Sequence, residues 1–269
     1  MKNLLDLNGE VAVVIGAAGV LAGAIAEAFA EAGARVAVLD LNAEKGEERA
    51  QKINQGGGRA RFFFCNVLER ETLRKANEEV ESALGAPTIL LNGAGGNDPK
   101  TTVSDDNPFE NIPLENWRRN FDLNLVGGAL LPCQVFGPGM VARKRGSIIN
   151  IASVSAHIPL SKVVSYSASK AAVLSLTRFL AREWARHGVR VNSITPGFFP
   201  AEQNRRLLFN EDGTPNARTQ AVWNHTPMGR FGEAQELLGA ALFLASSKAS
   251  SFVTGADIRV DGGFLAQTI

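Results

Sequence analysis

Seven short apolar runs alternate with longer stretches of helical periodicity, and this alternation limits the chain to very few folds. The apolar runs, rich in β-branched residues, cover residues 11–15, 35–39, 61–65, 88–91, 147–151, 189–194 and 258–260. The helical stretches cover residues 19–32, 43–55, 69–84, 114–143, 165–186 and 233–246. Short apolar runs without polar alternation indicate strands buried on both faces. We therefore predict an α/β fold in which helices cover both faces of a parallel sheet.

The connections between these strands narrow the topology further. Right-handed crossovers predict a doubly wound, seven-stranded sheet in a single domain over residues 1–269. A (β/α)8 barrel suits the chain length, but only seven strand-like runs are present. Residues 96–113 and 196–232 are polar, contain prolines and resist regular assignment. Both follow the carboxyl end of a predicted strand, where open α/β sheets bind ligands, so we interpret them as substrate-loop insertions.

Charge and cysteine content exclude several classes of protein. The chain has 28 Lys+Arg and 27 Asp+Glu, a net charge of +1, so it lacks the basic excess of a nucleic-acid binder. We expect no membrane association, because no apolar run approaches about 18 residues. Two cysteines are too few for a disulfide framework and indicate a reducing, cytoplasmic setting. Three scattered histidines predict no metal site.

The turn after the first strand has the composition of a dinucleotide-binding turn. It reads Gly16-Ala-Ala-Gly19-Val-Leu21-Ala-Gly23 and runs into a predicted helix. Small residues let the backbone approach a pyrophosphate, and the helix N-terminus offers N–H groups to it. Asp40 ends the second strand, at the place of an acid that binds the adenosine ribose hydroxyls. Its carboxylate would repel a 2′-phosphate, so we expect NAD as the cofactor.

One tyrosine stands among 15 phenylalanines, and its surroundings indicate acid–base chemistry. If residues 165–186 are helical, Tyr166 and Lys170 share one face, one turn apart. An ammonium group at that distance favours the phenolate and lowers the tyrosine pKa. Tyr166 would then act as general acid or base on an alcohol or carbonyl oxygen, which Ser153 would hold.

Several motifs together resemble those of the short-chain dehydrogenase/reductase family over essentially the whole chain. One is Tyr166-Ser-Ala-Ser-Lys170, with Ser153 thirteen residues before it. The others are Asn92-Gly93-Ala94-Gly95 after the fourth strand, Asn124 in a helix, Arg190-Val-Asn-Ser-Ile-Thr-Pro196-Gly197 and Asp261-Gly-Gly263. Each motif alone is modest evidence, but the set is highly specific.

The resemblance implies a Rossmann-type fold, a homotetramer and a role for each matched residue. Tyr166 would be the proton donor and acceptor, Lys170 would bind the nicotinamide ribose, and Asn124 would hold a water in a proton relay. The remaining matches would contact the cofactor: Asn66 and its neighbour Val67 at the adenine, Asn92, Gly93, Ala94 and Gly95 at the adenosine and ribose, and Pro196, Gly197 and Phe199 at the carboxamide.

The glycine turn departs from the family pattern. The family's Thr-Gly-x-x-x-Gly-x-Gly has Ile15 in the Thr place, with Val20 and Ala22 in the second and third Gly places. Gly19 lies one position early, so the glycines of this turn are displaced relative to the family pattern. We expect a rebuilt turn that still binds phosphate.

The loops bear on the substrate. They carry Asn97, Gln203, Asn204 and Arg205 rather than an apolar wall, which favours a hydrophilic, anionic substrate. Together with the glycine turn they resemble a sugar-acid branch of the family, the D-mannonate oxidoreductases (D-fructuronate reductases). This implies reduction of the 5-keto group of D-fructuronate by NADH. Another polyol or keto-sugar-acid dehydrogenase, such as gluconate 5-dehydrogenase, a non-catalytic NAD-binding protein and an epimerase or dehydratase of this fold remain open.

Overall fold

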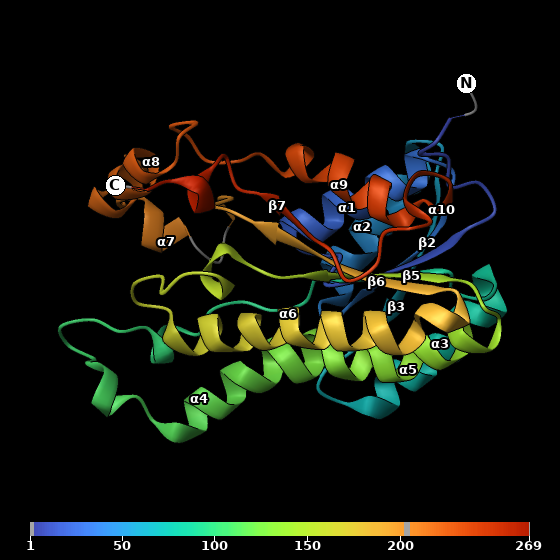
Figure 1. Cartoon of the computed structure of the whole chain (residues 1–269), viewed down its shortest axis with the longest axis horizontal. Helices are drawn as coiled ribbons and strands as arrows, with labels where there is room; N and C mark the ends of the chain where they lie inside the picture. Colours follow the sequence, from blue (N-terminus) through green and yellow to red (C-terminus); the bar gives the residue numbers. More distant parts are fainter. Residues whose placement is uncertain (1–2, 202–204, 269) are drawn as a thin grey trace.

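The chain folds around one seven-stranded, fully parallel sheet with helices on both faces (Figure 1). The computed structural model describes residues 3–201 and 205–268. Its strands are β1 (Val11–Ile15), β2 (Arg35–Asp40), β3 (Arg59–Phe64), β4 (Ile89–Asn92), β5 (Gly146–Ile151), β6 (Val189–Pro196) and β7 (Asp257–Val260). Their order across the sheet is β3-β2-β1-β4-β5-β6-β7. The chain winds from the middle to one edge and then to the other, which confirms the doubly wound topology.

The helices form two layers, each closing one apolar cluster against the sheet. One layer contains α1 (Val20–Glu31), α2 (Ala43–Gln55) and α9 (Leu238–Ala245), with Phe29 in its core. The other contains α3 (Arg70–Leu84), α5 (Leu131–Ala142) and α6 (Val164–Trp184), with Phe136 in its core (Figure 1). The central strands β1 and β4 are buried along their whole length, as their β-branched and leucine-rich sequences require.

Shorter elements complete the described chain. The short α-helices are α4 (Leu114–Phe121), α7 (Arg205–Leu208), α8 (Ala217–His225) and α10 (Ser247–Ser250). The 3₁₀ turns are η1 (Pro99–Thr101), η2 (Phe109–Asn111), η4 (Val154–Ala156), η5 (Ala185–His187), η7 (Ala234–Leu237) and η8 (Phe264–Ala266).

The long helix predicted over residues 114–143 forms, but its middle is π-helical. This segment, η3 (Asp122–Leu130), joins α4 to α5. It lets the helix pass close to the exit of β4: a Cβ on Gly128 would lie 3.0 Å from the carbonyl oxygen of Ala94. Gly128 is therefore needed for this close approach. π-Helical turns are frequent at functional sites.

By length and composition the same helix could cross a membrane. The described part of the chain has one such helix, Leu114–Ala142, with a mean hydropathy of 1.5 in its most apolar window. The sequence prediction overlooked it. In the structure Cys133, Phe136 and Met140 pack in the core between this helix and the sheet, so internal packing accounts for its apolar character.

Both predicted loop insertions lie at the carboxyl ends of the strands. Residues 96–113 follow β4 and contain η1 and η2, whereas 196–232 begin at the end of β6 and contain α7 and α8. Figure 1 shows both segments at the same end of the molecule. They border the switch point between β1 and β4, where open α/β sheets bind ligands.

Candidate active site

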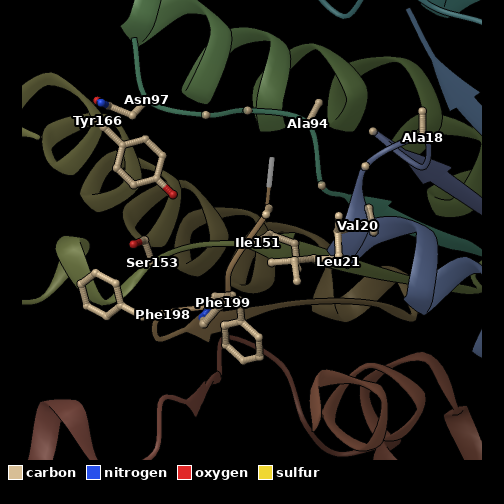
Figure 2. Close-up of a pocket in the computed structure, with 18 of the residues that line it drawn as sticks. Ala18, Val20, Leu21, Ala94, Asn97, Ile151, Ser153, Tyr166, Phe198 and Phe199 are labelled. Carbon is tan, nitrogen blue, oxygen red and sulfur yellow. The ribbon is translucent and has the colours of Figure 1, made fainter. Parts of the chain in front are cut away.

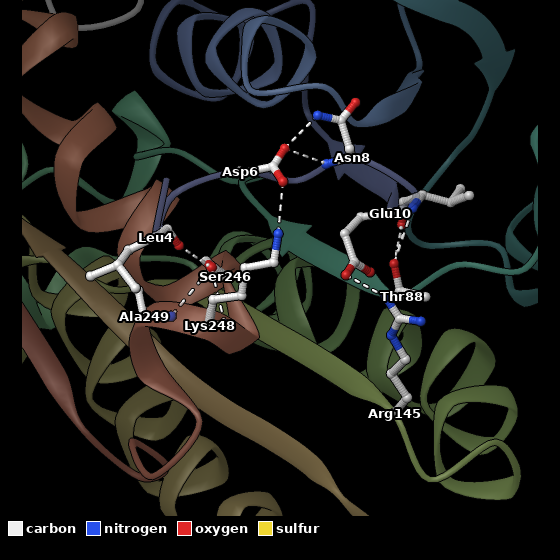
Figure 3. Close-up of polar contacts among 10 residues, drawn as sticks. Leu4, Asp6, Asn8, Glu10, Thr88, Arg145, Ser246, Lys248 and Ala249 are labelled. Carbon is white, nitrogen blue, oxygen red and sulfur yellow. Dashed lines mark hydrogen bonds and ion pairs between the residues drawn. The ribbon is translucent and has the colours of Figure 1, made fainter. Parts of the chain in front are cut away.

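A cavity of about 860 Å³ opens at this end of the sheet. The turn after β1, the exits of β4 and β5, the first turns of α6 and the segment after β6 all contribute to its lining. Figure 2 shows Ala18, Val20 and Leu21 at one end of it, and Ser153 and Tyr166 at the other. Its size is that of a small-molecule site.

The altered glycine turn keeps the shape of a phosphate cradle. Gly16 has a φ of +77°, and a Cβ there would lie 2.8 Å from the backbone nitrogen of Ala94. Gly19 is the N-cap of α1, and no side chain caps this helix. The first turn of α1 therefore presents its N–H groups and its positive dipole end to the cavity, which Leu21 also lines. These features fit the pyrophosphate of a dinucleotide.

Asp40 is fixed beside this turn, as the sequence predicts. Its Oδ2 accepts a hydrogen bond from the backbone nitrogen of Ala18 (3.0 Å), and its Oδ1 accepts one from Asn42 (2.9 Å). A carboxylate has about four acceptor positions, so this one retains capacity for ribose hydroxyls.

Cations of α2 also line the nucleotide end of the cavity: Lys45, Arg49 and Lys52. Arg49 and Lys52 both form ion pairs with Glu27, and the Lys52 Nζ lies 2.9 Å from its carboxylate. Because Gly23 has no side chain, the Arg49 guanidinium packs directly against the backbone of α1; a Cβ on Gly23 would lie 2.5 Å from it. These ion pairs reduce the positive charge that Asp40 faces.

Tyr166, Lys170 and Ser153 meet at the other end of the cavity. Tyr166 and Lys170 lie one turn apart on α6, with the Lys170 Nζ 5.6 Å from the centroid of the tyrosine ring. Lys170 is buried and donates to the carbonyl oxygen of Ile151 at 2.8 Å. Ser153 follows β5 and forms a hydrogen bond with Tyr166. Figure 2 shows the phenol oxygen pointing into the cavity.

The electrostatics of this end differ from the sequence prediction. Burial raises the pKa of the Tyr166 phenol, and the hydrogen bond from Ser153 lowers it in part. Burial also lowers the pKa of Lys170 from 10.5 to about 8. The net shift of the tyrosine pKa is therefore upward, opposite to the lowering expected from Lys170, because burial of the phenol dominates. At neutral pH the phenol carries its proton.

Asn124 is a fully buried residue of the π-helical segment whose side chain links this segment to the exit of β4. Its Oδ1 accepts from the Gly96 nitrogen (2.9 Å), and its Nδ2 donates to the carbonyl oxygens of Gly96 (2.8 Å) and Asn120 (2.9 Å). A Cβ on Gly95 would lie 2.6 Å from Asn124 Oδ1 and 3.5 Å from Lys170 Nζ. The side chain therefore fixes the exit of β4 beside Lys170, which leaves only limited capacity for the expected relay water.

Three of the predicted cofactor contacts do not line the cavity. The Asn66 amide donates to Glu69 at 2.7 Å and accepts from the Leu68 nitrogen. Its neighbour Val67 packs in the core. Asn92 is buried, and its amide donates to Asn150 at 2.8 Å across the sheet. The sequence correctly placed these residues at strand ends, but side-chain direction separates them from the cavity.

The remaining predicted cofactor residues do line it. They are Gly93, Ala94 and Gly95 at the exit of β4, and Pro196, Gly197 and Phe199 after β6. Phe199 is buried, with its ring against Gly232.

The substrate end is less polar than the sequence suggested. Among described residues, Leu160, Val163, Phe198, Leu207 and Leu208 line it, so an apolar wall is present. Asn97 lines it too: its Nδ2 donates to Thr102 at 2.7 Å, while its Oδ1 is buried and has no hydrogen-bond partner within residues 3–201 and 205–268. Gln203, Asn204 and the side chain of Arg205 lie outside the described part of the structure.

Besides these apolar residues, sequence reasoning missed a charged lining residue of the loop insertion, Arg218 on α8. Its only sequence signal was a place shortly after the helix-capping Asn216. Trp223 on the same helix packs against Phe231 (ring centroids 5.5 Å apart) and does not line the cavity. Among the described residues there is no cluster of His, Cys, Asp and Glu that could hold a metal.

Comparison with known proteins assigns the family. The model of the enoyl-(acyl carrier protein) reductase family matches residues 16–265. An uncharacterised oxidoreductase of Haemophilus influenzae is 43% identical over 97% of this chain and 95% of its own. The chain belongs to the short-chain dehydrogenase/reductase family. It is accordingly an oxidoreductase with a site for a nicotinamide cofactor.

Two solved structures of this family are close in both sequence and shape. A Haemophilus protein with bound NAD, whose name proposes D-mannonate oxidoreductase activity, is 40% identical, with a TM-score of 0.93 and 99% of both chains covered. A gluconate 5-dehydrogenase from Burkholderia cenocepacia, in complex with NADP and tartrate, is 33% identical, with a TM-score of 0.88 and 98% of both chains covered. Family members of this shape therefore include both NAD and NADP complexes.

Proposed function

We propose that this protein is an NAD(H)-dependent oxidoreductase that interconverts D-mannonate and D-fructuronate. The observation that carries the chemistry is the phenol of Tyr166, which is hydrogen-bonded to Ser153 and points into a cavity that Lys170 also lines. The similarity to the NAD-bound Haemophilus protein supports this sugar acid. Gluconate 5-dehydrogenase activity is the second candidate, supported by the Burkholderia structure.

In the reducing direction the chain supplies the proton and the geometry. Bound NADH would supply a hydride to the carbonyl carbon of the substrate. Ser153 would hold the carbonyl oxygen, and Tyr166 would donate its phenol proton to that oxygen to give the alcohol. Lys170, charged below a pKa of about 8, would stabilise the phenolate that remains and bind the nicotinamide ribose. Asn124 would keep the exit of β4 in place beside Lys170, and a relay through its water would return the proton.

We propose NAD rather than NADP because of Asp40. Its backbone hydrogen bonds hold the carboxylate where the adenosine ribose would lie, and a 2′-phosphate there would face a like charge. Arg49 and Lys52, two cations of α2, are already paired with Glu27, which supports this choice.

Asn97 supports a hydroxyl-rich substrate. Its buried Oδ1 has no hydrogen-bond partner among the described residues, and a buried acceptor in that state costs about 1–3 kcal/mol. A rotation of the amide into the cavity would let a substrate hydroxyl donate to it.

We also propose a homotetramer, as the family resemblance implies. Leu114 and Phe179 are exposed on the outer helical layer, at 60% and 57%, and an interface there would bury them. Light scattering after size exclusion is expected to give four times the chain mass, and a monomer would contradict this.

A keto-acid panel tests the proposed activity. NADH oxidation is measured with D-fructuronate, 5-keto-D-gluconate and simple ketones such as acetone. We expect turnover with D-fructuronate above that with 5-keto-D-gluconate, and none with acetone. The reverse order of the two acids would favour the gluconate activity. No turnover with either acid, despite measured NADH binding, would overturn the proposal.

A further inference from the structure

Arg218 is a partly dehydrated cation without a counter-ion in the described part of the chain. Arg218 lines the cavity, and burial lowers the pKa of Arg218 from its ordinary value. Its hydrogen bonds go to neutral groups and are long, 3.3 Å to the Ser161 hydroxyl and 3.4 Å to the Ser161 carbonyl oxygen. Two contacts leave most of the five N–H donors of a guanidinium unused.

The backbone around Arg218 is rigidly held. Asn216 caps α8 by accepting from the Thr219 nitrogen at 3.0 Å, and the buried Thr219 hydroxyl donates to the Leu208 carbonyl oxygen. Leu208 and its neighbour Leu207 line the cavity beside Arg218. A cation in such partly apolar surroundings is stabilised by an anion brought to it, and the fixed backbone keeps the guanidinium ready.

The position of Arg218 indicates which anion this is. Ser161 precedes α6, the helix that carries Tyr166, so the guanidinium belongs to the catalytic end of the cavity. The phosphate cradle of Gly16 and Gly19 lies at the other end, where Figure 2 shows Ala18, Val20 and Leu21. An anion at Arg218 is therefore a group of the substrate. Planar guanidinium groups bind carboxylates with two parallel hydrogen bonds.

We propose that Arg218 binds the carboxylate of the substrate and selects acids over uncharged sugars of the same shape. This inference rests on the proposed function for the identity of the acid. The carboxylate of D-fructuronate lies at the far end of its carbon chain from the reacting ketone. Arg218 would hold that end while Ser153 and Tyr166 hold the carbonyl oxygen, and the leucines of the wall would pack against the carbon chain.

The test uses a matched pair of substrates, D-fructuronate and D-fructose, which differ in a carboxylate replaced by a hydroxymethyl group. The variants are Arg218→Gln, Arg218→Lys and, as a control, Lys162→Gln, which removes an exposed charge close by that does not line the cavity. Charged hydrogen bonds of this kind correspond to about 10–100-fold in affinity. We expect Arg218→Gln to raise KM for D-fructuronate by that factor, while its kcat/KM for D-fructose changes less than about threefold. The KM of Arg218→Lys for D-fructuronate should lie between those of wild type and Arg218→Gln. Lys162→Gln should have the wild-type KM for D-fructuronate.

Calorimetric binding of D-mannonate to the NAD-bound protein gives a readout that does not depend on turnover. We expect Arg218→Gln to weaken D-mannonate binding by the same factor. Equal losses for the acid and the neutral sugar, or unchanged D-mannonate binding, would overturn the role of Arg218 even if the enzyme reduces D-fructuronate. If the wild type turns over no acid but binds D-mannonate, and Arg218→Gln weakens that binding, the role of Arg218 is supported while the proposed function fails. A wild type that binds no sugar acid would overturn both.

Discussion

At the scale of single residues, burial decides the protonation of the catalytic pair. The raised pKa of Tyr166 keeps a proton on the phenol, which suits reduction of a ketone. The lowered pKa of Lys170, about 8, means that folding places a charged ammonium in a site that disfavours it. The site is therefore built at the expense of stability, a common feature of active sites.

Replacing Lys170 tests that conflict. Between pH 8 and 10.5 the unfolded chain binds more protons at Lys170 than the folded chain does. The loss of folding stability caused by burying the charged Lys170 is therefore complete below about pH 8 and disappears as the pH approaches 10.5. We expect Lys170→Met to lower kcat at least about 100-fold. At pH 7 it should raise the free energy of unfolding by about 1–3 kcal/mol, less than the full charge penalty because the bond to Ile151 is lost.

Chemical denaturation of the NAD-free protein at several pH values measures this effect. The stability difference between Lys170→Met and wild type should narrow as the pH rises above 8. A difference that is independent of pH, or a variant with wild-type kcat, would contradict the role of Lys170.

Asp40 controls the choice of nicotinamide cofactor. Asp40→Asn removes the charge but keeps an oxygen that can accept from Ala18 or Asn42. We expect the ratio of dissociation constants for NADPH and NADH to fall at least about tenfold, because the like-charge repulsion disappears. Fluorescence titration with both cofactors measures it. A wild type that already prefers NADPH would show that Asp40 has been misinterpreted.

The residues that sequence could and could not place differ in one physical respect. Tyr166 and Lys170 are four apart on a helix, so the helical period alone puts them on one face. Asn66 and Asn92 follow or end their strands as expected, but the Asn66 amide is taken up by the nearby Glu69. The bond of Asn92 to Asn150 crosses the sheet and depends on tertiary packing. Arg218 reaches the cavity only through the path of a loop.

At the scale of elements, strand and helix periodicity predicted nearly all of the regular structure. β6 extends two residues beyond its predicted end because Thr195 and Pro196 still pair with β7. The π-helical turn in the long helix had no periodic signal, since its cause is the close approach of Gly128 to Ala94.

Gly128 is therefore expected to be needed for the site. Gly128→Ala would place a Cβ 3.0 Å from two carbonyl oxygens, those of Ala94 and Leu123, and Ala94 lines the cavity. We expect a loss of about 1–3 kcal/mol in unfolding free energy and weaker NADH binding. Gly239→Ala on α9 is the control: it meets nothing within 4 Å and should stabilise the helix by up to about 1 kcal/mol.

Denaturant titration and NADH binding of both variants check this. If Gly128→Ala is as stable and binds NADH as tightly as the Gly239→Ala control, the π-helical contact does not shape the cavity.

At the scale of the whole molecule, the strand order explains why one cavity contains both the candidate cofactor turn and the candidate catalytic residues. The switch point between β1 and β4 gathers the glycine turn, the exit of β4 and the first turns of α6 at one edge of the sheet. Strand–helix alternation was enough to predict this arrangement. It could not predict the mixed wall of the substrate end, because the long loops carry no periodicity that fixes their path.

The most direct test of the account compares wild type with Tyr166→Phe in NADH oxidation by D-fructuronate, with NADH binding measured on both. Tyr166 is the only tyrosine in the chain, so no other phenol can replace it. We predict unchanged NADH binding and a kcat lowered by about 10²–10⁴-fold, the usual contribution of general acid–base catalysis. A Tyr166→Phe enzyme that reduces D-fructuronate within tenfold of the wild-type rate would contradict the assignment of Tyr166 as the proton donor.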